Sequence, residues 1–385
     1  MKSEPKSILV VTGEPSGEEH AARLVCSLRN AWPGRSYKWF GTGGSKMAAQ
    51  GVELMTEVDS LAAIGPVAAS SNLFNYLSLF RELRKRIRRS PPDVAVLVDF
   101  PEFNLRLAPS LKKLGVPVCY FVSPQVWAWR PGRIRKIKNN VSKMLVIFPF
   151  EAAFYHRHGV EAIYVGNPMA RLSKSHSVEV GPEDGKARIA LLPGSRQNEI
   201  GHILPIQLEV ASRIQSKIPS CFHVLAAPGV HRSILESSCR EWKRRHGVEM
   251  DIQVVKGPIE EQLPWADCAI VKSGTSTLQA MVLGIPFAMV YRMSKLSYLL
   301  LRPLVRSQSY CLANLVAGKK IVPEFVQGEA KAEAISAYLI ELLLSSEKMQ
   351  RVKQKLQNAS NKLGTLDAYK EAAKHIVSFV ENSKK

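Results

Sequence analysis

The chain has 385 residues, of which 46% are hydrophobic, and it carries a formal net charge of +20 at pH 7. This length is long for one domain and the apolar content is sufficient for two cores, so we expect two domains. No run of 18 apolar residues and no secretory signal occurs, and the six scattered cysteines exclude a zinc knuckle or disulfide framework and fit a reducing cytoplasm.

Apolar strands alternate with helical patterns along the chain, which is typical of parallel sheets with crossover helices. We expect strands at 7–12, 37–42, 94–99, 116–122, 143–147, 162–165, 188–192, 223–227, 252–255, 268–271 and 287–291. The polar stretch at 173–186 contains two glycines and a proline and indicates a connection between two doubly wound α/β domains that meet at a cleft. The domains are therefore placed at 1–170 and 171–350, with a C-terminal helix at 351–385 that can cross back to the first domain.

The first strand ends in a glycine-rich turn, Gly13-Glu14-Pro15-Ser16-Gly17, which opens the first helix. The turn matches neither a P-loop nor the dinucleotide motif G-x-G-x-x-G. It lies where open parallel sheets bind ligands, and the two glycines would let a substrate approach the backbone closely. The alternative is that the glycines serve the turn alone.

Residues 72–89 combine apolar residues at helical spacing with a cluster of basic residues. This pattern predicts an amphipathic helix that docks on an anionic membrane surface. The residues expected to make this contact are Leu73, Leu77, Phe80, Arg81, Arg84, Lys85 and Arg88. A solvated helix face is the alternative. The sequence contains no RRM, KH or helix-turn-helix signature, so we do not expect nucleic acid as a partner.

Asp99 closes the apolar strand 94–98 and is followed by Phe100 and Pro101. A carboxylate beside apolar side chains at a strand end can have a raised pKa and remove a proton from a hydroxyl group. Capping of the helix that begins at Pro101 is the alternative reading of this aspartate.

A second strand-end loop reads Ser-Pro-Gln-Val-Trp-Ala-Trp-Arg at 123–130. Structural tryptophans are common, but two within three residues on such a loop suggest the wall of a binding site. The loop therefore adds a candidate surface next to Asp99.

The second half repeats the order of strand, glycine turn and helix at Leu-Pro-Gly-Ser-Arg, 191–196. Arg196 can make a bidentate contact with phosphate, or it can be a surface arginine that closes the turn. The strand at 268–271 leads into Ser273-Gly274-Thr275-Ser276-Thr277 at a helix start, where backbone N–H groups attract an anion. These hydroxyl residues can also be ordinary helix caps, but their convergence with Arg196 at one sheet edge favours a phosphate site.

These motifs, together with Ala-Asn-Leu-Val-Ala-Gly at 313–318, occur in an order that resembles the lipid-A-disaccharide synthase family over residues 7–330. The resemblance implies a GT-B fold and an inverting, metal-independent glycosyltransferase with no cofactor. The donor would be UDP-2,3-diacylglucosamine and the acceptor 2,3-diacylglucosamine 1-phosphate, also called lipid X. The products would be the β-1,6-linked disaccharide 1-phosphate and UDP.

The resemblance also assigns residues to roles, with Asp99 as the catalytic base. The expected donor and UDP-binding residues are Gly13, Glu14, Ser16, Gly17, Ser195, Arg196, Ser273, Gly274, Thr275, Ser276, Thr277, Gln279 and Asn314. The expected acceptor wall comprises Asn104, Ser123, Gln125, Trp127, Trp129 and Arg130. The enzyme would be cytoplasmic and peripheral on the cytoplasmic face of the inner membrane. A second copy of the chain, in a homo-oligomer, is a further candidate partner.

Two positions depart from the family pattern. Gln279 stands where a ribose-binding glutamate is expected, and residues 66–71 are smaller and more polar than the apolar membrane-contacting stretch. Membrane affinity would then depend more on Arg and Lys. Two other functions stay open. The chain can be another UDP-sugar transferase or epimerase of the same fold, or a non-catalytic basic protein that binds membranes or RNA.

Overall fold

The computed structural model describes residues 6–13, 15–32, 37–57, 71–174, 185–305, 307 and 309–382. The chain forms two compact units, one made of Met1–Pro168 and Thr365–Lys385 and the other of Met169–Gly364. Glu14 and residues 66–70, which figured in the sequence analysis, lie outside the described residues, as does most of the polar connection at 173–186.

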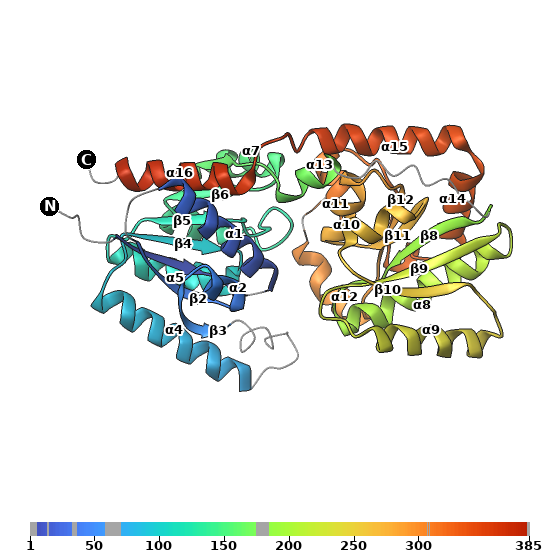
Figure 1. Ribbon diagram of the computed structural model, residues 1–385, viewed down its shortest axis with the longest axis horizontal. Helices are drawn as coiled ribbons and strands as arrows, with labels where there is room; N and C mark the ends of the chain where they lie inside the picture. The colour runs from blue at the N-terminus through green and yellow to red at the C-terminus, as the bar shows by residue number, and fades with distance from the viewer. Residues whose placement is uncertain are drawn as a thin grey trace. The chain divides into compact units, whose positions relative to one another are not determined.

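The first unit is built on a seven-stranded sheet with the order β3-β2-β1-β4-β5-β6-β7, in which all paired strands are parallel (Figure 1). Its strands are β1 (Lys6–Val11), β2 (Tyr37–Gly43), β3 (Glu53–Glu57), β4 (Val94–Val98), β5 (Val118–Phe121), β6 (Lys143–Val146) and β7 (Ala162–Tyr164). Every residue of β4 is buried, as expected for an inner strand of a parallel sheet covered on both faces.

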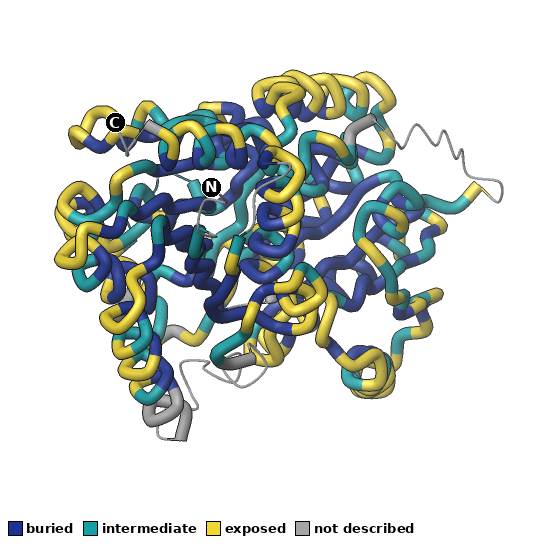
Figure 2. Tube along the Cα trace, turned by 60° about the vertical axis from the view of Figure 1, so that its left-hand side comes forward, coloured by how far each residue is buried: buried dark blue, intermediate teal, exposed yellow. Residues whose placement is uncertain are grey.

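Helices cover both faces of this sheet and create two apolar cores. They are α1 (Pro15–Ala31), α2 (Ser45–Ala49), α4 (Ser71–Arg89), α5 (Pro101–Lys113), α6 (Arg133–Asn140), α7 (Pro149–Arg157) and α16 (Ala368–Asn382). Alternate residues of β1 enter the two cores: Leu9 packs with α4 and α5, whereas Ile8 packs with α1 and α16. Figure 2 shows the strands in the buried colour and the outer faces of the helices in the exposed colour.

The second unit contains a six-stranded parallel sheet with the order β10-β9-β8-β11-β12-β13. Its strands are β8 (Ala187–Leu192), β9 (Ser220–Ala226), β10 (Ile252–Lys256), β11 (Cys268–Lys272), β12 (Phe287–Tyr291) and β13 (Glu324–Val326). Its longer helices are α8 (Gln197–Gln215), α9 (Arg232–His246), α11 (Thr275–Val282), α14 (Ala332–Leu344) and α15 (Ser346–Asn361). The shorter ones are η1 (Pro168–Lys174), α10 (Ile259–Gln262), η2 (Leu263–Trp265), α12 (Lys295–Leu301), η3 (Arg302–Leu304), α13 (Leu312–Ala317) and η4 (Gln327–Glu329).

Two features of the predicted fold need correction. The tail is not one helix over 351–385, because Gly364, with φ +63°, separates α15 in the second unit from α16 in the first. Strands β3 and β13 are absent from the prediction, since both are short edge strands without a continuous apolar run. The α/β class with two doubly wound sheets is confirmed.

The strand orders locate one switch point in each sheet, between β1 and β4 in the first unit and between β8 and β11 in the second. Chain connections leave these two neighbouring strands in opposite directions, so the carboxyl ends of the strands open a crevice where α/β sheets bind ligands. The turns after β1 and β4, which contain Gly13 and Asp99, lie at the first switch point. The turns after β8 and β11, which contain Ser195 and Ser273, lie at the second.

Candidate active site

Asp99 lies directly after β4 in a backbone conformation that non-glycine residues rarely adopt. Its φ is 48° and that of Phe100 is 46°, so two successive residues are left-handed. Such residues cost on the order of 1–3 kcal/mol each and persist only where the surroundings enforce them. The half-buried carboxylate is therefore held by the fold at the switch point of the first sheet.

Two buried side chains hold this turn by hydrogen bonds to the carbonyl oxygen of Asp99. Asn104 Nδ2 donates to it at 2.7 Å, and Tyr120 Oη donates to it at 2.5 Å. Asn104 is fully buried and supports the turn from inside the protein. The prediction that it forms part of an acceptor wall is therefore wrong. The sequence contained a signal for this supporting role, because Asn104 lies about one turn into α5 and only five residues after Asp99.

The glycine turn after β1 packs directly against the Asp99 turn. A Cβ atom on Gly13 would lie 2.3 Å from the Phe100 ring, and one on Gly17 would lie 2.6 Å from Thr12 Oγ1 and 3.6 Å from Asp99 Cβ. Only glycine permits this approach at either position. Ser16, the residue before Gly17, is exposed. The structure thus brings Gly13 and Gly17 together with Asp99, and their contact with UDP stays a prediction.

The tryptophan loop after β5 is anchored by a residue that the sequence analysis missed. Ser123 Oγ and Trp127 Nε1 donate to the same Glu151 oxygen at 2.7 and 3.0 Å, and the Phe148 N–H donates to the other oxygen at 3.1 Å. Glu151 is 1% exposed, and burial raises its pKa to about 7 against the opposing effect of these hydrogen bonds. Its position two residues after Pro149, in the first turn of α7, resembles an ordinary capping acid and gives no other signal.

Two arginines lie over the ring of the second tryptophan of the loop. The Cζ atoms of Arg130 and Arg133 lie 4.6 and 5.4 Å from the Trp129 ring centroid, a cation–π arrangement. Both guanidinium groups also pair with Glu102 on α5, Arg130 at 2.6 Å. Gln125 is exposed on the same loop. This arrangement gives a partly exposed aromatic and cationic surface beside the start of α5, suited to a sugar phosphate.

At the second switch point, three charged residues form a chain of ion pairs. Lys272 Nζ, at the end of β11, lies 2.9 Å from Glu199 Oε1 in the first turn of α8, and Arg196 Nη1 lies 3.7 Å from the same oxygen. The side chain of Arg196 is 73% exposed, so it remains available to a ligand. Ser195 is also exposed. Lys272 was not among the predicted site residues. Its place at the end of a buried strand, where parallel sheets bind ligands, could have identified it.

The loop Ser273–Thr277 divides into residues that hold the loop and residues that remain available. Ser273 Oγ donates to the Tyr310 carbonyl oxygen at 2.6 Å, and Thr277 Oγ1 donates to the Gly274 carbonyl oxygen at 2.8 Å. Thr275 is exposed and Ser276 half-buried at the amino terminus of α11, where Gly274 has φ 140°. Backbone N–H groups at such a helix start favour an anion.

Gln279 and Asn314 differ in what their amides contact. Gln279 is half-buried on α11, and its side chain makes no hydrogen bond with the described part of the chain. The Asn314 amide instead binds the Val322 carbonyl and Glu324 through Nδ2, at 3.0 and 2.7 Å, and accepts two backbone N–H groups through Oδ1. Since all four hydrogen-bonding positions are occupied, the predicted direct contact of Asn314 with UDP is replaced by a supporting role.

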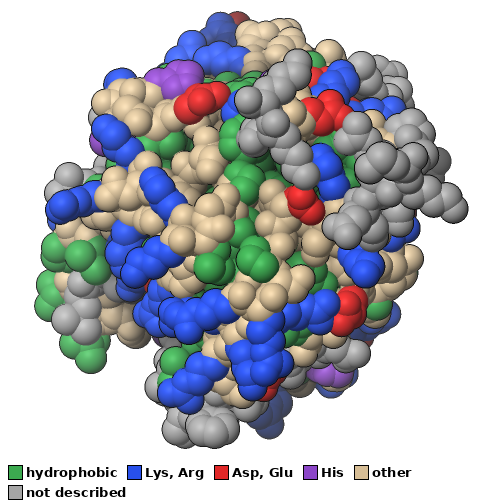
Figure 3. Space-filling model, turned by 90° about the vertical axis from the view of Figure 1, so that its left-hand side faces the viewer, with side chains coloured by type: hydrophobic (Ala, Val, Ile, Leu, Met, Phe, Trp, Pro, Cys, Tyr) green, Lys and Arg blue, Asp and Glu red, His purple; other side chains and the backbone are tan. Residues whose placement is uncertain are grey.

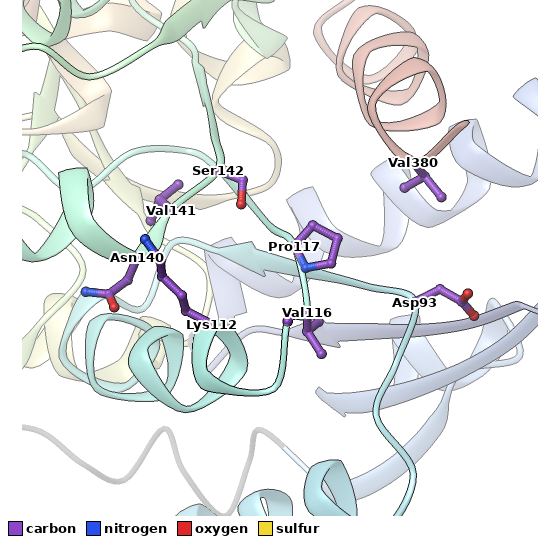
Figure 4. A pocket seen from close by; sticks show the side chains of 9 residues that line it. Asp93, Lys112, Val116, Pro117, Asn140, Val141, Ser142 and Val380 are labelled. Atoms are coloured by element: carbon purple, nitrogen blue, oxygen red, sulfur yellow. The ribbon is translucent and has the colours of Figure 1, made fainter. Parts of the chain in front are cut away.

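A pocket of about 540 Å³ lies at the opposite edge of the first sheet, near the amino-terminal ends of its strands (Figure 4). Its polar groups are engaged within the protein, because Asp93 accepts the Ser7 N–H at 2.9 Å and Ser142 accepts the Val118 N–H at 3.2 Å. This pocket therefore offers few groups to a ligand, and the chemistry concentrates at the carboxyl edge.

The predicted membrane helix, α4, turns most of its apolar side chains into the core. Tyr76, Leu79 and Leu83 are buried there, while Leu77 is 37% exposed and Phe80 packs edge-on against Phe103. The side chain of Leu73 lies outside the described residues. The apolar face is thus smaller than predicted, since helical periodicity does not distinguish a core face from a membrane face.

The cations of α4 remain largely at the surface. Arg81, Lys85 and Arg88 are exposed. Arg84 and Arg88 line a pocket of about 270 Å³ with Ser110, Lys113 and Leu114, and this lining contains no carboxylate. Figure 3 shows that Lys and Arg side chains far outnumber acidic ones on the face that it presents.

The two parallel doubly wound sheets have the fold of the GT-B class, which includes glycosyltransferases and sugar-nucleotide epimerases. The family model described as Lipid-A-disaccharide synthetase matches residues 8–378. The chain belongs to the lipid-A-disaccharide synthase family and is a glycosyltransferase of lipid A disaccharide formation.

One relative supports the family, and two solved structures share the fold. The lipid-A-disaccharide synthase of Myxococcus xanthus is 37% identical over 383 residues, covering 98% of each chain. A putative UDP-N-acetylglucosamine 2-epimerase from Listeria monocytogenes has a similar fold, with a TM-score of 0.64, 11% identity and coverage of 99% of this chain and 97% of that one. The Neisseria meningitidis UDP-GlcNAc 2-epimerase, solved with UDP-GlcNAc, gives a TM-score of 0.58, 13% identity and coverage of 98% and 100%.

Two features are absent from the described part of the chain. No helix among the described residues is long and apolar enough to cross a membrane. Within the same residues, no three His, Cys, Asp or Glu side chains gather as ligands for a metal ion.

Proposed function

We propose that the enzyme transfers 2,3-diacylglucosamine from UDP-2,3-diacylglucosamine to the 6-hydroxyl of 2,3-diacylglucosamine 1-phosphate, with inversion at the anomeric carbon. The products are the β-1,6-linked disaccharide 1-phosphate and UDP. The observation that carries this proposal is the enforced left-handed turn that presents Asp99 at the first switch point, beside Gly13 and Gly17. Membership of the family supplies the substrates.

In the proposed reaction, Asp99 accepts the proton of the acceptor hydroxyl as its oxygen attacks the anomeric carbon. The bond from that carbon to the diphosphate oxygen breaks, and its electron pair leaves with UDP. The hydrogen bonds from Asn104 and Tyr120 to the Asp99 carbonyl keep the turn, and with it the carboxylate, in a fixed position. Fixed geometry of this kind lowers the barrier by pre-organisation.

The leaving diphosphate requires positive charge or oriented dipoles, and the second switch point offers both. Arg196 presents an exposed guanidinium, and the start of α11 presents backbone N–H groups. Glu199, which holds Lys272 at 2.9 Å, also orients Arg196 at 3.7 Å. The Neisseria meningitidis relative of this fold with bound UDP-GlcNAc supports a UDP-sugar as the ligand.

The acceptor and the donor carry acyl chains and remain in a bilayer, so the enzyme must reach them at a membrane surface. We place it on the cytoplasmic face of the inner membrane, held mainly by charge. Arg84, Arg88 and Lys113 would bind anionic headgroups, while Leu77 and Leu114, each 37% exposed, would contact the interface.

The decisive experiment measures UDP release by the purified enzyme with both acylated substrates in a chelator-containing buffer. The proposal expects turnover with this pair and none with UDP-N-acetylglucosamine as donor. Asp99→Asn should remove turnover while UDP binding is retained. Turnover of the non-acylated sugar nucleotide alone would instead favour the epimerase alternative, and UDP binding without any turnover would favour a non-catalytic protein.

A further inference from the structure

The second sheet has an open, polar face near the amino-terminal ends of its strands. A pocket of about 340 Å³ is lined there mainly by Arg188, Cys221, His223, Asp251, Gln253 and Trp265. Strands of parallel sheets are normally buried on both faces, but β9 alternates between buried and half-buried residues from Ser220 to His223, and Gln253 of β10 is exposed. The pocket therefore lies on a part of the sheet that the described residues leave partly uncovered.

Arg188 is the unusual residue of this pocket, because it is nearly buried and its guanidinium has no ion pair in the described part of the chain. The residue is 9% exposed, and its guanidinium makes no hydrogen bond or ion pair with any residue that the structure describes. Its Cζ lies 6.0 Å from the Trp265 ring centroid. A nearly buried charge is costly unless it is paired, so an arginine that lines a pocket without an ion pair favours an anion as its ligand.

The nearby carboxylates do not pair with the Arg188 guanidinium. Asp267 Oδ2 accepts the backbone N–H of Arg188 at 2.8 Å, and Asp251 Oδ2 lies 3.5 Å from Lys186 Nζ. His223 stacks on Trp265 with a centroid separation of 3.5 Å, and its buried Nδ1 has no partner. A half-turn about the Cβ–Cγ bond would leave the ring in the same plane, keep this stack and exchange Nδ1 with Cδ2, since ring orientation is assigned from such partners.

We propose that this pocket is a second anion site, which binds the phosphate group of a small phosphorylated polyol. Arg188 donates two parallel hydrogen bonds to the phosphate, the geometry in which a guanidinium binds this group best. Asp251 and Gln253, at the outer side of the pocket, accept hydrogen bonds from the hydroxyl groups. The volume of 340 Å³ is in the range of small-molecule sites.

This site is separate from the proposed UDP site. Arg188 is near the start of β8, whereas Ser195 and Arg196 follow its end. Arg188 and Leu192 are four residue steps apart on the extended strand, which corresponds to roughly 13 Å. Binding here is thus expected to persist when UDP occupies the other edge of the sheet.

The test follows the indole N–H resonance of Trp265 by NMR in protein saturated with UDP, with Trp265→Phe to assign the signal. Titrants are inorganic phosphate, glycerol 3-phosphate and uncharged glycerol. We expect the resonance to shift with the two phosphates, more tightly with glycerol 3-phosphate, and not with glycerol. Arg188→Gln should weaken binding about tenfold or more, the effect of losing a charge-assisted hydrogen bond.

Arg240→Gln, which removes an exposed arginine of α9, is the charge-matched control and should leave binding unchanged. Equal affinity for inorganic phosphate and glycerol 3-phosphate would overturn the polyol assignment. The wild-type titration decides the anion site even if Arg188→Gln does not fold. Absence of any shift at about 50 mM phosphate, well above a millimolar dissociation constant, would overturn it.

Discussion

The indole Nε1 of Trp127 donates a hydrogen bond of 3.0 Å to the buried carboxylate of Glu151, and the Ser123 hydroxyl binds the same oxygen. This contact ties the loop after β5 to the first turn of α7. The position of the tryptophan loop is thereby coupled to a group whose pKa is raised to about 7.

Stability should fall as pH rises through the titration of Glu151. Burial raises its pKa from 4.5 to about 7, so between these values the native state binds the proton more tightly than the unfolded state does. The free energy of unfolding should decrease by roughly 3 kcal/mol from pH 4.5 to pH 8 through this group. Denaturant unfolding of wild type and Glu151→Gln at both pH values measures it, and an identical pH dependence in the variant would contradict the assignment.

Removing either donor to the Asp99 carbonyl should impair turnover more than substrate binding. Asn104→Ala and Tyr120→Phe each delete one hydrogen bond to the strained turn. We expect a loss of about 1 kcal/mol in stability and a fall in kcat of about tenfold, with little change in KM. Steady-state kinetics measures this, with Tyr338→Phe in α14 as the control for loss of a tyrosine hydroxyl. A rise in KM at constant kcat would show that the turn positions substrate and not the base.

Gly17→Ala should reduce activity although alanine favours a helix. The new Cβ would lie 2.6 Å from Thr12 Oγ1 and displace the turn beside Asp99. The matched control is Gly201→Ala in α8, where nothing lies within 4 Å of the added Cβ, so stability should rise by up to about 1 kcal/mol. Thermal unfolding and UDP release measured on both variants separate the two effects. Wild-type activity of Gly17→Ala would show that the close packing has no catalytic role.

Arg196→Gln should weaken UDP binding without loss of stability. The side chain is 73% exposed and its ion pair with Glu199 is long, at 3.7 Å, so the fold depends little on it. We expect the dissociation constant for UDP to rise about tenfold or more by calorimetry. Arg232→Gln, another exposed arginine that pairs with a glutamate on its own helix, should leave it unchanged. Equal effects of the two substitutions would indicate a general charge effect.

Arg88→Gln combined with Lys113→Gln should reduce binding to anionic vesicles. Each cation contributes about 1 kcal/mol near an anionic surface, so the pair should lower the partition coefficient more than tenfold. Sedimentation with phosphatidylglycerol vesicles tests this, and Arg240→Gln with Arg244→Gln on α9 provides an equal change in net charge. If both pairs reduce binding equally, the pocket on α4 and α5 is not the docking site.

The sequence predicted most of the fold because its inner strands are distinctive. A run such as Val94–Val98 is apolar throughout and buried on both faces, whereas the edge strands β3 and β13 carry glutamates and resemble loops. The α/β class and the family are confirmed, and the roles of the site residues remain predictions.

Residues that act through buried contacts could not be predicted in the same way. Glu151 becomes significant only when folding removes its carboxylate from water and brings Ser123 and Trp127 to it. The amide of Asn314 likewise has a family motif around it, but only the fold shows that backbone groups and Glu324 occupy it. Local sequence contains no information on either environment.

The chain passes out of the first unit at Pro168 and returns at Thr365, and α16 then supplies Ala372, Ala373, Ile376 and Val380 to the core shared with α1. During synthesis, this core therefore stays incomplete while the whole second unit is translated. At about 5–20 residues per second, the delay is roughly 10–40 s. The second unit can fold within this interval, so the core of the unit that carries Asp99 is completed after it, and an apolar face of its sheet stays uncovered until α16 leaves the ribosome.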